Sequence, residues 1–186
     1  MRIVLLILFI CSCCDGSVLE KAQKIKLVAL DVDGVMTNGE ISYSSLGEEI
    51  KTFNVKDGLG LVLLAENEFI TVIITGRESS IVERRGKELK VRHIYQNVKN
   101  KQRVIRELAD EYTLDFEQIC YIGDDLPDLP ALRITGLACC PSDAVRQVKE
   151  ACHWVSKHRG GHGAVRELAD LLLESQDYLL EKRRNL

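Results

Sequence analysis

The sequence predicts a doubly wound α/β fold built on a mostly parallel sheet, and three observations lead to this class. Short apolar runs typical of buried strands alternate with segments whose apolar residues recur at helical spacing. A chain of 186 residues, 46% hydrophobic and 28% charged, suits one globular domain with a full core. Polar motifs directly follow several of the apolar runs, as expected where ligands bind at the carboxyl ends of parallel strands.

The strands are predicted from apolar or β-branched runs at residues 25–30, 71–74, 93–95, 119–122 and 137–139, with a last edge strand at 154–155. Helical spacing predicts helices over residues 58–67, 79–90, 99–112 and 163–180, and one from an N-cap at Ser142 through Glu150. Residues 41–44 and 49–53 alternate apolar and polar around a turn, which predicts a β-hairpin. This hairpin, at about residues 39–55, follows an aspartate pair directly, so we expect it to act as a flap.

The sequence predicts a leader at residues 1–17 and a single domain at residues 18–180. The C-terminal tail is expected to begin at about residue 157, within this domain, and to continue to residue 186. Residues 1–16 carry an early arginine, a short apolar run and three cysteines. This pattern leaves three interpretations open: a secretion signal, a lipoprotein-like signal, or a leader added by an upstream start codon. We expect a cytoplasmic protein, with export as the minor alternative.

Composition excludes several classes of partner. The net charge is −3 and no basic stripe precedes the C-terminus, which argues against nucleic acid. The N-terminal apolar run is too short to span a bilayer, so we expect no membrane partner. Cys120, Cys139 and Cys140 lie in apolar surroundings typical of buried thiols. The cysteine spacing matches neither a zinc site nor a disulfide framework, which favours a reducing cytosol.

Two carboxylates follow the first predicted strand of the sheet. Asp31 and Asp33 are two residues apart and precede Gly34, so their side chains point the same way if the strand geometry continues. Like charges this close repel each other unless a cation or a shared proton relieves them. Mg²⁺ together with a phosphate ester would do so. The structural alternative is a pair of turn-forming aspartates.

Three further signals fall at the ends of predicted strands. Thr75 follows the strand at 71–74, Lys101 lies near the start of the helix after 93–95, and Gly123-Asp124-Asp125 with Asp128 follows 119–122. Each has a structural alternative, because Thr-Gly and Gly-Asp-Asp are common in turns and most lysines are surface charges. Their occurrence in this order, each after a strand, favours a shared functional site.

These motifs resemble those of the haloacid dehalogenase superfamily of phosphotransferases, over nearly the whole chain from Val18 to Gln176. A finer resemblance is to the 3-deoxy-D-manno-octulosonate 8-phosphate (KDO 8-phosphate) phosphatases. The stretches that carry it are residues 48–58, 74–77, 123–128 and 160–167. The resemblance implies Mg²⁺-dependent hydrolysis of an acidic sugar phosphate, in lipopolysaccharide precursor biosynthesis. Alternatives are a nonulosonate 9-phosphate substrate or a non-catalytic oligomerising module.

The resemblance also implies roles for the site residues. Asp31 would be the nucleophile that forms an aspartyl-phosphate, and Asp33 the general acid and base. Thr75 and Lys101 would bind and orient the phosphoryl group. Asp31, Asp124 and the backbone carbonyl of Asp33 would hold Mg²⁺. Asp125 and Asp128 would hold the water ligands of the metal and the side chain of Lys101 in place.

Substrate contacts are implied for one segment and for several single residues. The contacts are Asp33, Asn54, Val55, Lys56, Asp57, Gly58, Arg77, Arg85 and Lys101. One departure from the family is Val62, where an arginine is often found. The spacing between motifs leaves no room for a separate cap domain. The resemblance therefore implies a homo-oligomer, expected to be a tetramer, whose hairpins close neighbouring sites.

Overall fold

The computed structural model describes residues 16–176. Residues 1–15 of the predicted leader lie outside the described residues, as do residues 177–186, which include the end of the predicted last helix. The assignment of residues 1–17 as a leader and 18–180 as the domain therefore stays a prediction. No helix within residues 16–176 combines the length and the apolar character that crossing a membrane requires.

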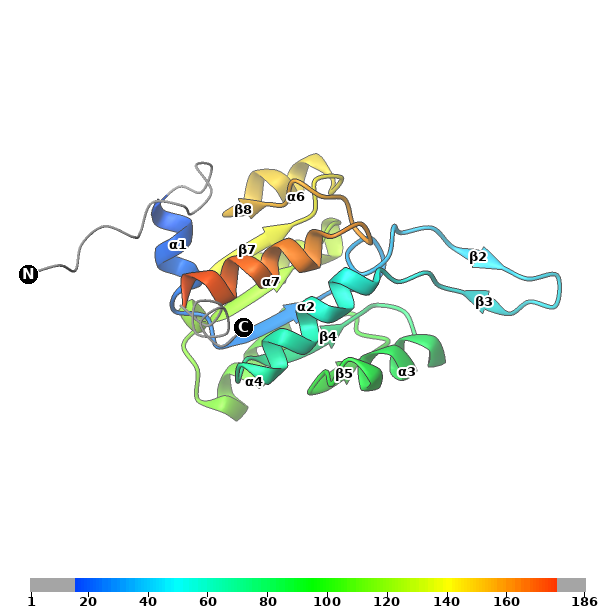
Figure 1. Ribbon diagram of the computed structural model, residues 1–186, viewed down its shortest axis with the longest axis horizontal. Coiled ribbons are helices and arrows are strands. Elements are labelled where there is room, and N and C mark those ends of the chain that lie inside the picture. The colour runs from blue at the N-terminus through cyan, green and yellow to red at the C-terminus, as the bar shows by residue number, and fades with distance from the viewer. Residues whose placement is uncertain (1–15, 177–186) are drawn as a thin grey trace, which may run out of the picture.

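A six-stranded parallel sheet forms the centre of the described chain (Figure 1). Its strands are β1 (Leu27–Leu30), β4 (Ile70–Ile74), β5 (His93–Tyr95), β6 (Ile119–Ile122), β7 (Leu137–Cys140) and β8 (Trp154–Val155). They lie in the order β5-β4-β1-β6-β7-β8, and every neighbouring pair is parallel. The chain thus winds outward from β1 in one direction and then in the other, which confirms the doubly wound α/β prediction.

Helices cover both faces of this sheet. The first face is covered by α1 (Gly16–Ala22), α2 (Val55–Glu66), α3 (Ser80–Glu88) and α7 (Ala164–Ser175). The second is covered by α4 (Lys101–Tyr112), α5 (Leu129–Leu132) and α6 (Arg146–Ala151), with short 3₁₀ turns η1 (Phe116–Gln118) and η2 (Leu126–Asp128). Strand side chains alternate between these faces, so a central strand must be apolar throughout. In β1, Val28 and Leu30 join the first core, and Leu27 and Ala29 join the second.

Several element boundaries differ from the sequence prediction. The N-cap predicted at Ser142 is wrong, because α6 begins at Arg146 and Val145 occupies its N-cap position. Helix α2 begins at Val55 rather than at residue 58, since the side chain of Asn54 accepts a hydrogen bond from the backbone N–H of Lys56 and caps the helix. Helices α1 and α5 were not predicted.

The hairpin projects from the sheet as a narrow arm (Figure 1). Its strands β2 (Ser42–Tyr43) and β3 (Glu49–Ile50) are antiparallel, and the paired region is shorter than the sequence alternation predicts. Apolar side chains on the arm face solvent: Ile41 is 54% exposed, Tyr43 61%, Leu46 84% and Ile50 52%. A two-stranded hairpin is marginal in water on its own, so these side chains are open to a further contact.

Candidate active site

The predicted catalytic and metal-binding residues meet where the winding of the sheet reverses. Asp31 directly follows β1, Thr75 directly follows β4, and Asp124 lies two residues after β6. Because β4, β1 and β6 are neighbours in the sheet, their carboxyl ends bring these three side chains together. A pocket of about 300 Å³ opens there, and its lining includes Asp31, Asp33, Thr75, Arg77, Lys101, Asp124, Asp125 and Asp128. This is the edge at which doubly wound folds bind ligands.

Lys101 lies between two carboxylates at the bottom of this pocket. Its Nζ is 2.7 Å from Oδ2 of Asp31 and 2.6 Å from Oδ1 of Asp128, and its side chain is only 4% exposed. Lys101 is the first residue of α4, and Asn100 caps that helix by accepting a hydrogen bond from the backbone N–H of Arg103. The cap fixes where the helix begins and therefore where the ammonium group lies.

Asp128 is buried and accepts hydrogen bonds on both carboxylate oxygens. Oδ1 accepts from the hydroxyl of Tyr121 at 2.7 Å as well as from Lys101, and Oδ2 accepts from the backbone N–H groups of Asp124 and Asp125 at 3.0 and 3.2 Å. A carboxylate with this many partners is fixed in place. It ties Lys101 to the loop that carries Asp124. Tyr121 was not predicted, because a tyrosine inside an apolar strand gives no signal in sequence.

Burial and mutual repulsion shift the pKa values of the acidic groups. Burial raises the pKa of Asp31 to about 6, against the opposing effect of Lys101. Burial, together with the charges of Asp128 and Asp31, raises the pKa of Asp124 to about 7. Burial alone would lower the pKa of Lys101, but Asp31 and Asp128 raise it above its ordinary value. Carboxylates with raised pKa values crowd together here, as expected where a cation binds.

The acidic cluster fits a divalent cation. Ligand atoms of Asp31, Asp124 and Asp128 all lie within 4.8 Å of one another. Oδ1 of Asp124 is buried without a hydrogen-bond partner, so it has a free lone pair for a metal. Since Asp128 is already engaged by four donors, Asp31 and Asp124 are the side chains best placed to bind the ion. A set made only of oxygen ligands matches the preference of Mg²⁺.

A glycine makes this arrangement possible. Gly34 has φ +87°, a left-handed conformation that glycine adopts without steric cost. A Cβ atom at this position would lie 2.1 Å from Oδ2 of Asp124. The loop after β1 therefore needs glycine for its turn and to let the Asp124 carboxylate approach.

The hairpin reaches back to the site through charged residues that the prediction did not include. The ammonium group of Lys51 donates to Oδ1 of Asp33, and its side chain is only 3% exposed. Glu49 lies 2.9 Å from Nη2 of Arg77, which also donates to the hydroxyl of Tyr43 at 3.4 Å. Glu49 and Lys51 lie two residues apart in a stretch that alternates, so the sequence did indicate that they share a face. It did not indicate what that face would contact.

The Asn54–Gly58 segment and Arg85 lie outside the lining of the 300 Å³ pocket. Asp57 is buried and caps helix α7, which is distant in the sequence, by accepting hydrogen bonds from the backbone N–H groups of Gly163 and Arg166. Arg85 packs over the ring of Phe53 and contacts Glu88 at 3.2 Å, while Val55 is 80% exposed. Their role as substrate contacts stays a prediction.

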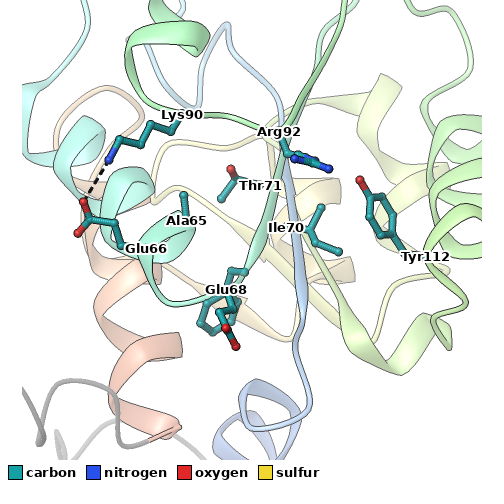
Figure 2. A pocket seen from close by; sticks show the side chains of 9 residues that line it. Ala65, Glu66, Glu68, Ile70, Thr71, Lys90, Arg92 and Tyr112 are labelled. Carbon is teal, nitrogen blue, oxygen red and sulfur yellow. Dashed lines mark hydrogen bonds and ion pairs between the residues drawn. The ribbon is translucent and has the colours of Figure 1, made fainter.

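A larger cavity of about 470 Å³ lies elsewhere (Figure 2). It is lined at the amino end of β4 by Ile70 and Thr71, whereas Thr75 follows the opposite end of that strand. Lys90, Arg92 and Tyr112 also line it, and none of the predicted site residues does. The larger of these two cavities is therefore not the one that contains the predicted catalytic residues.

Comparison with known proteins supports this assignment. Residues 80–168 match the family of haloacid dehalogenase-like hydrolases. The 3-deoxy-D-manno-octulosonate 8-phosphate phosphatase of Yersinia pestis is 41% identical over 162 residues, which cover 87% of each chain. The crystal structure of the phosphatase of the same name from Moraxella catarrhalis, in complex with magnesium, phosphate and KDO, has a TM-score of 0.85 and 39% identity. The match covers 89% of this chain and 97% of that one.

A cobalt-bound relative extends the comparison to a second metal. The deoxy-D-mannose-octulosonate 8-phosphate phosphatase of Haemophilus influenzae is 38% identical, with a TM-score of 0.81 over 84% of this chain and 92% of that one. Metal-bound relatives and an acidic cluster that fits a cation together support Mg²⁺ as the cofactor. The chain therefore belongs to the family of the 3-deoxy-D-manno-octulosonate 8-phosphate phosphatases, within the haloacid dehalogenase-like hydrolases, and is a phosphoric monoester hydrolase.

Proposed function

We propose that the chain hydrolyses KDO 8-phosphate to the free sugar acid and phosphate, through an aspartyl-phosphate on Asp31. The observation that carries this proposal is the buried contact of 2.7 Å between Asp31 and Lys101, in one pocket with Asp33, Thr75 and Asp124. Such a cation keeps the carboxylate ionised and attracts the phosphate ester beside it.

In the first step a carboxylate oxygen of Asp31 attacks phosphorus, and the bond from phosphorus to the sugar oxygen breaks. Asp33 gives its proton to the departing alkoxide. In the second step Asp33 takes a proton from water, which attacks phosphorus and releases Asp31 and phosphate. Thr75 and Lys101 hold the phosphoryl oxygens throughout. Mg²⁺, held by Asp31, Asp124 and the backbone carbonyl of Asp33, supplies positive charge that neutralises the phosphoryl group.

The acidic end of the substrate needs cations beyond those that bind the phosphate. Arg77 is the best placed of the predicted contacts, because it lines the pocket and its Nε lies 3.7 Å from Oδ2 of Asp33. The relatives' names and the KDO bound in the Moraxella catarrhalis structure support this choice of substrate. We further propose that the reaction belongs to lipopolysaccharide precursor biosynthesis and takes place in the cytoplasm.

We infer a homotetramer in which the exposed apolar side chains of the hairpin meet another subunit and help to exclude bulk water from the site. The apolar surface at Ile41, Leu46 and Ile50 supports this inference.

Phosphate release from KDO 8-phosphate, a nonulosonate 9-phosphate and glucose 6-phosphate at saturating Mg²⁺ tests the proposal. We expect kcat/KM for KDO 8-phosphate to exceed that for glucose 6-phosphate by at least about tenfold. A higher kcat/KM for the nonulosonate 9-phosphate would identify that ester as the preferred substrate and leave the proposed reaction mechanism unchanged. Equal values for KDO 8-phosphate and glucose 6-phosphate would refute specificity for an acidic sugar. No release from any ester would favour a non-catalytic module, although such a module has no evident reason to retain Asp31, Asp33, Lys101 and Asp124.

A further inference from the structure

Four charged side chains form a closed ring of alternating sign beside the pocket. Lys51 contacts Oδ1 of Asp33, and its Nζ lies 3.5 Å from Oε1 of Glu49. The same Glu49 oxygen lies 2.9 Å from Nη2 of Arg77, whose Nε lies 3.7 Å from Oδ2 of Asp33. Both oxygens of the Asp33 carboxylate therefore face a cation, one from the hairpin and one from the loop after β4.

The side chain of Lys51 is more fully buried than the apolar side chains of the hairpin. Its side chain is 3% exposed, whereas the adjacent apolar residue Ile50 is 52% exposed. Removing an ammonium group from water is unfavourable unless a carboxylate compensates for it. The hairpin thus directs its charged residue inward, onto the carboxylate of Asp33, and leaves apolar residues outside.

We propose that Lys51 is a positioning residue of the phosphatase reaction: it donates to Oδ1 of Asp33 and so leaves Oδ2 as the oxygen that carries the proton transferred to the leaving group. This inference rests on the proposed role of Asp33 as general acid. Lys51 acts through Asp33 and makes the orientation of that carboxylate depend on a correctly placed hairpin. Glu49 has the accessory role of linking Lys51 to Arg77.

The choice of leaving group separates this role from a merely structural one. An alkoxide leaving from a sugar phosphate is strongly basic and needs a proton as the bond to phosphorus breaks. A nitrophenolate is stable as an anion and leaves without one. Loss of Lys51 should therefore harm hydrolysis of alkyl phosphates and largely spare p-nitrophenyl phosphate. Damage to the pocket itself, which also binds the phosphoryl group, would harm both.

The experiment compares kcat/KM of the full chain and its variants on KDO 8-phosphate and on p-nitrophenyl phosphate. This parameter reports the steps up to cleavage of the bond from phosphorus to the leaving oxygen. For Lys51→Met we expect a loss of at least about 30-fold with the sugar phosphate and of less than about threefold with the nitrophenyl ester. Lys51→Arg, which keeps the charge, should recover part of the loss. Lys87→Met, on the exposed face of α3, is the matched control and should change neither value.

Equal losses on both substrates would overturn the proposal in favour of a structural role, and so would no loss on either. If Lys51→Met does not fold, Lys51→Gln keeps a polar side chain without the charge and supports the same comparison. Failure of the proposed substrate is visible separately, as wild-type protein that cleaves p-nitrophenyl phosphate but not KDO 8-phosphate. In that case any alkyl phosphate that the wild type does cleave takes its place in the test.

Discussion

The ammonium nitrogen of Lys101 lies 2.6 Å from Oδ1 of Asp128, and this buried contact holds the lysine beside Asp31. Asp128 is 1% exposed and receives its other hydrogen bonds from Tyr121 and from the loop that carries Asp124. A single carboxylate thus fixes the cation on one side of the pocket and the candidate metal ligand on the other. Asp128 therefore contributes both to the stability of the fold and to the positions of Lys101 and Asp124.

Asp128→Asn tests this link. The amide removes the charge that compensates Lys101, and its NH₂ group cannot accept hydrogen bonds as the carboxylate does. Breaking a buried ion pair in this way typically costs about 3–5 kcal/mol. We expect a lower free energy of unfolding in urea and a reduced kcat. Asp110→Asn on the exposed face of α4 is the control, and an equal effect of both variants would contradict the role given to Asp128.

Mg²⁺ and protons should compete for the acidic cluster. The pKa values of Asp31 and Asp124 are raised to about 6 and about 7, above those of an unfolded chain. In metal-free protein these groups therefore favour the folded state below about pH 4, and this contribution is lost as pH rises through 6 and 7. Mg²⁺ binds the ionised forms and restores stability where they are charged.

The measurement is the shift in Tm caused by Mg²⁺ at two pH values. We expect a clearly larger upward shift at pH 8 than at pH 5.5. Asp124→Asn should abolish most of the shift at pH 8. Equal shifts at both pH values would mean that Mg²⁺ stabilises the protein at some place other than this cluster.

The hairpin should drive assembly. We expect sedimentation at micromolar concentration to give a tetramer, because Ile41, Leu46 and Ile50 are more than half exposed in the single chain. Replacing Ile41 and Leu46 with serine should shift the protein toward smaller species and lower its activity. A wild-type monomer with full activity would refute the proposal that subunits share a lid.

Most of the fold was predictable because its signals are local. Apolar runs of strand length marked every strand of the central sheet, and polar residues at their ends marked Asp31, Thr75 and Asp124. Helix α5 escaped prediction because a four-residue helix that contains Pro130 has no detectable periodicity. The cap at Ser142 was predicted from residue type alone, whereas in the structure the helix begins four residues later.

The contacts that were missed are those that depend on tertiary structure. Lys51 and Asp33 are separated by 18 residues, and only the folded hairpin brings them together. The capping of α7 by Asp57 spans more than 100 residues of sequence. Side-chain type and spacing cannot specify such pairs. The family resemblance supplied the roles of the site residues, but not these partners.

Arg77 should contribute to recognition of the acidic substrate. It lies in the turn after Thr75 and directs its guanidinium group toward Asp33 and Glu49. Arg77→Ala should weaken transition-state binding of KDO 8-phosphate by about 1.5–3 kcal/mol, the range for hydrogen bonds to charged groups. The measurement is kcat/KM on KDO 8-phosphate and on glucose 6-phosphate. A larger loss on the neutral sugar phosphate would exclude a role in recognising the carboxylate.

Trapping the covalent intermediate tests the central claim, that Asp31 is the nucleophile, most directly. Wild-type protein with Mg²⁺ is mixed with KDO 8-phosphate that carries radiolabelled phosphate, quenched in acid within milliseconds and digested. We predict label on the peptide that contains Asp31, and neither label nor turnover in a folded Asp31→Asn variant, because an amide is a poor nucleophile. Substrate consumption without label on that peptide, or an Asp31→Asn variant that keeps about a tenth of wild-type activity, would contradict the mechanism.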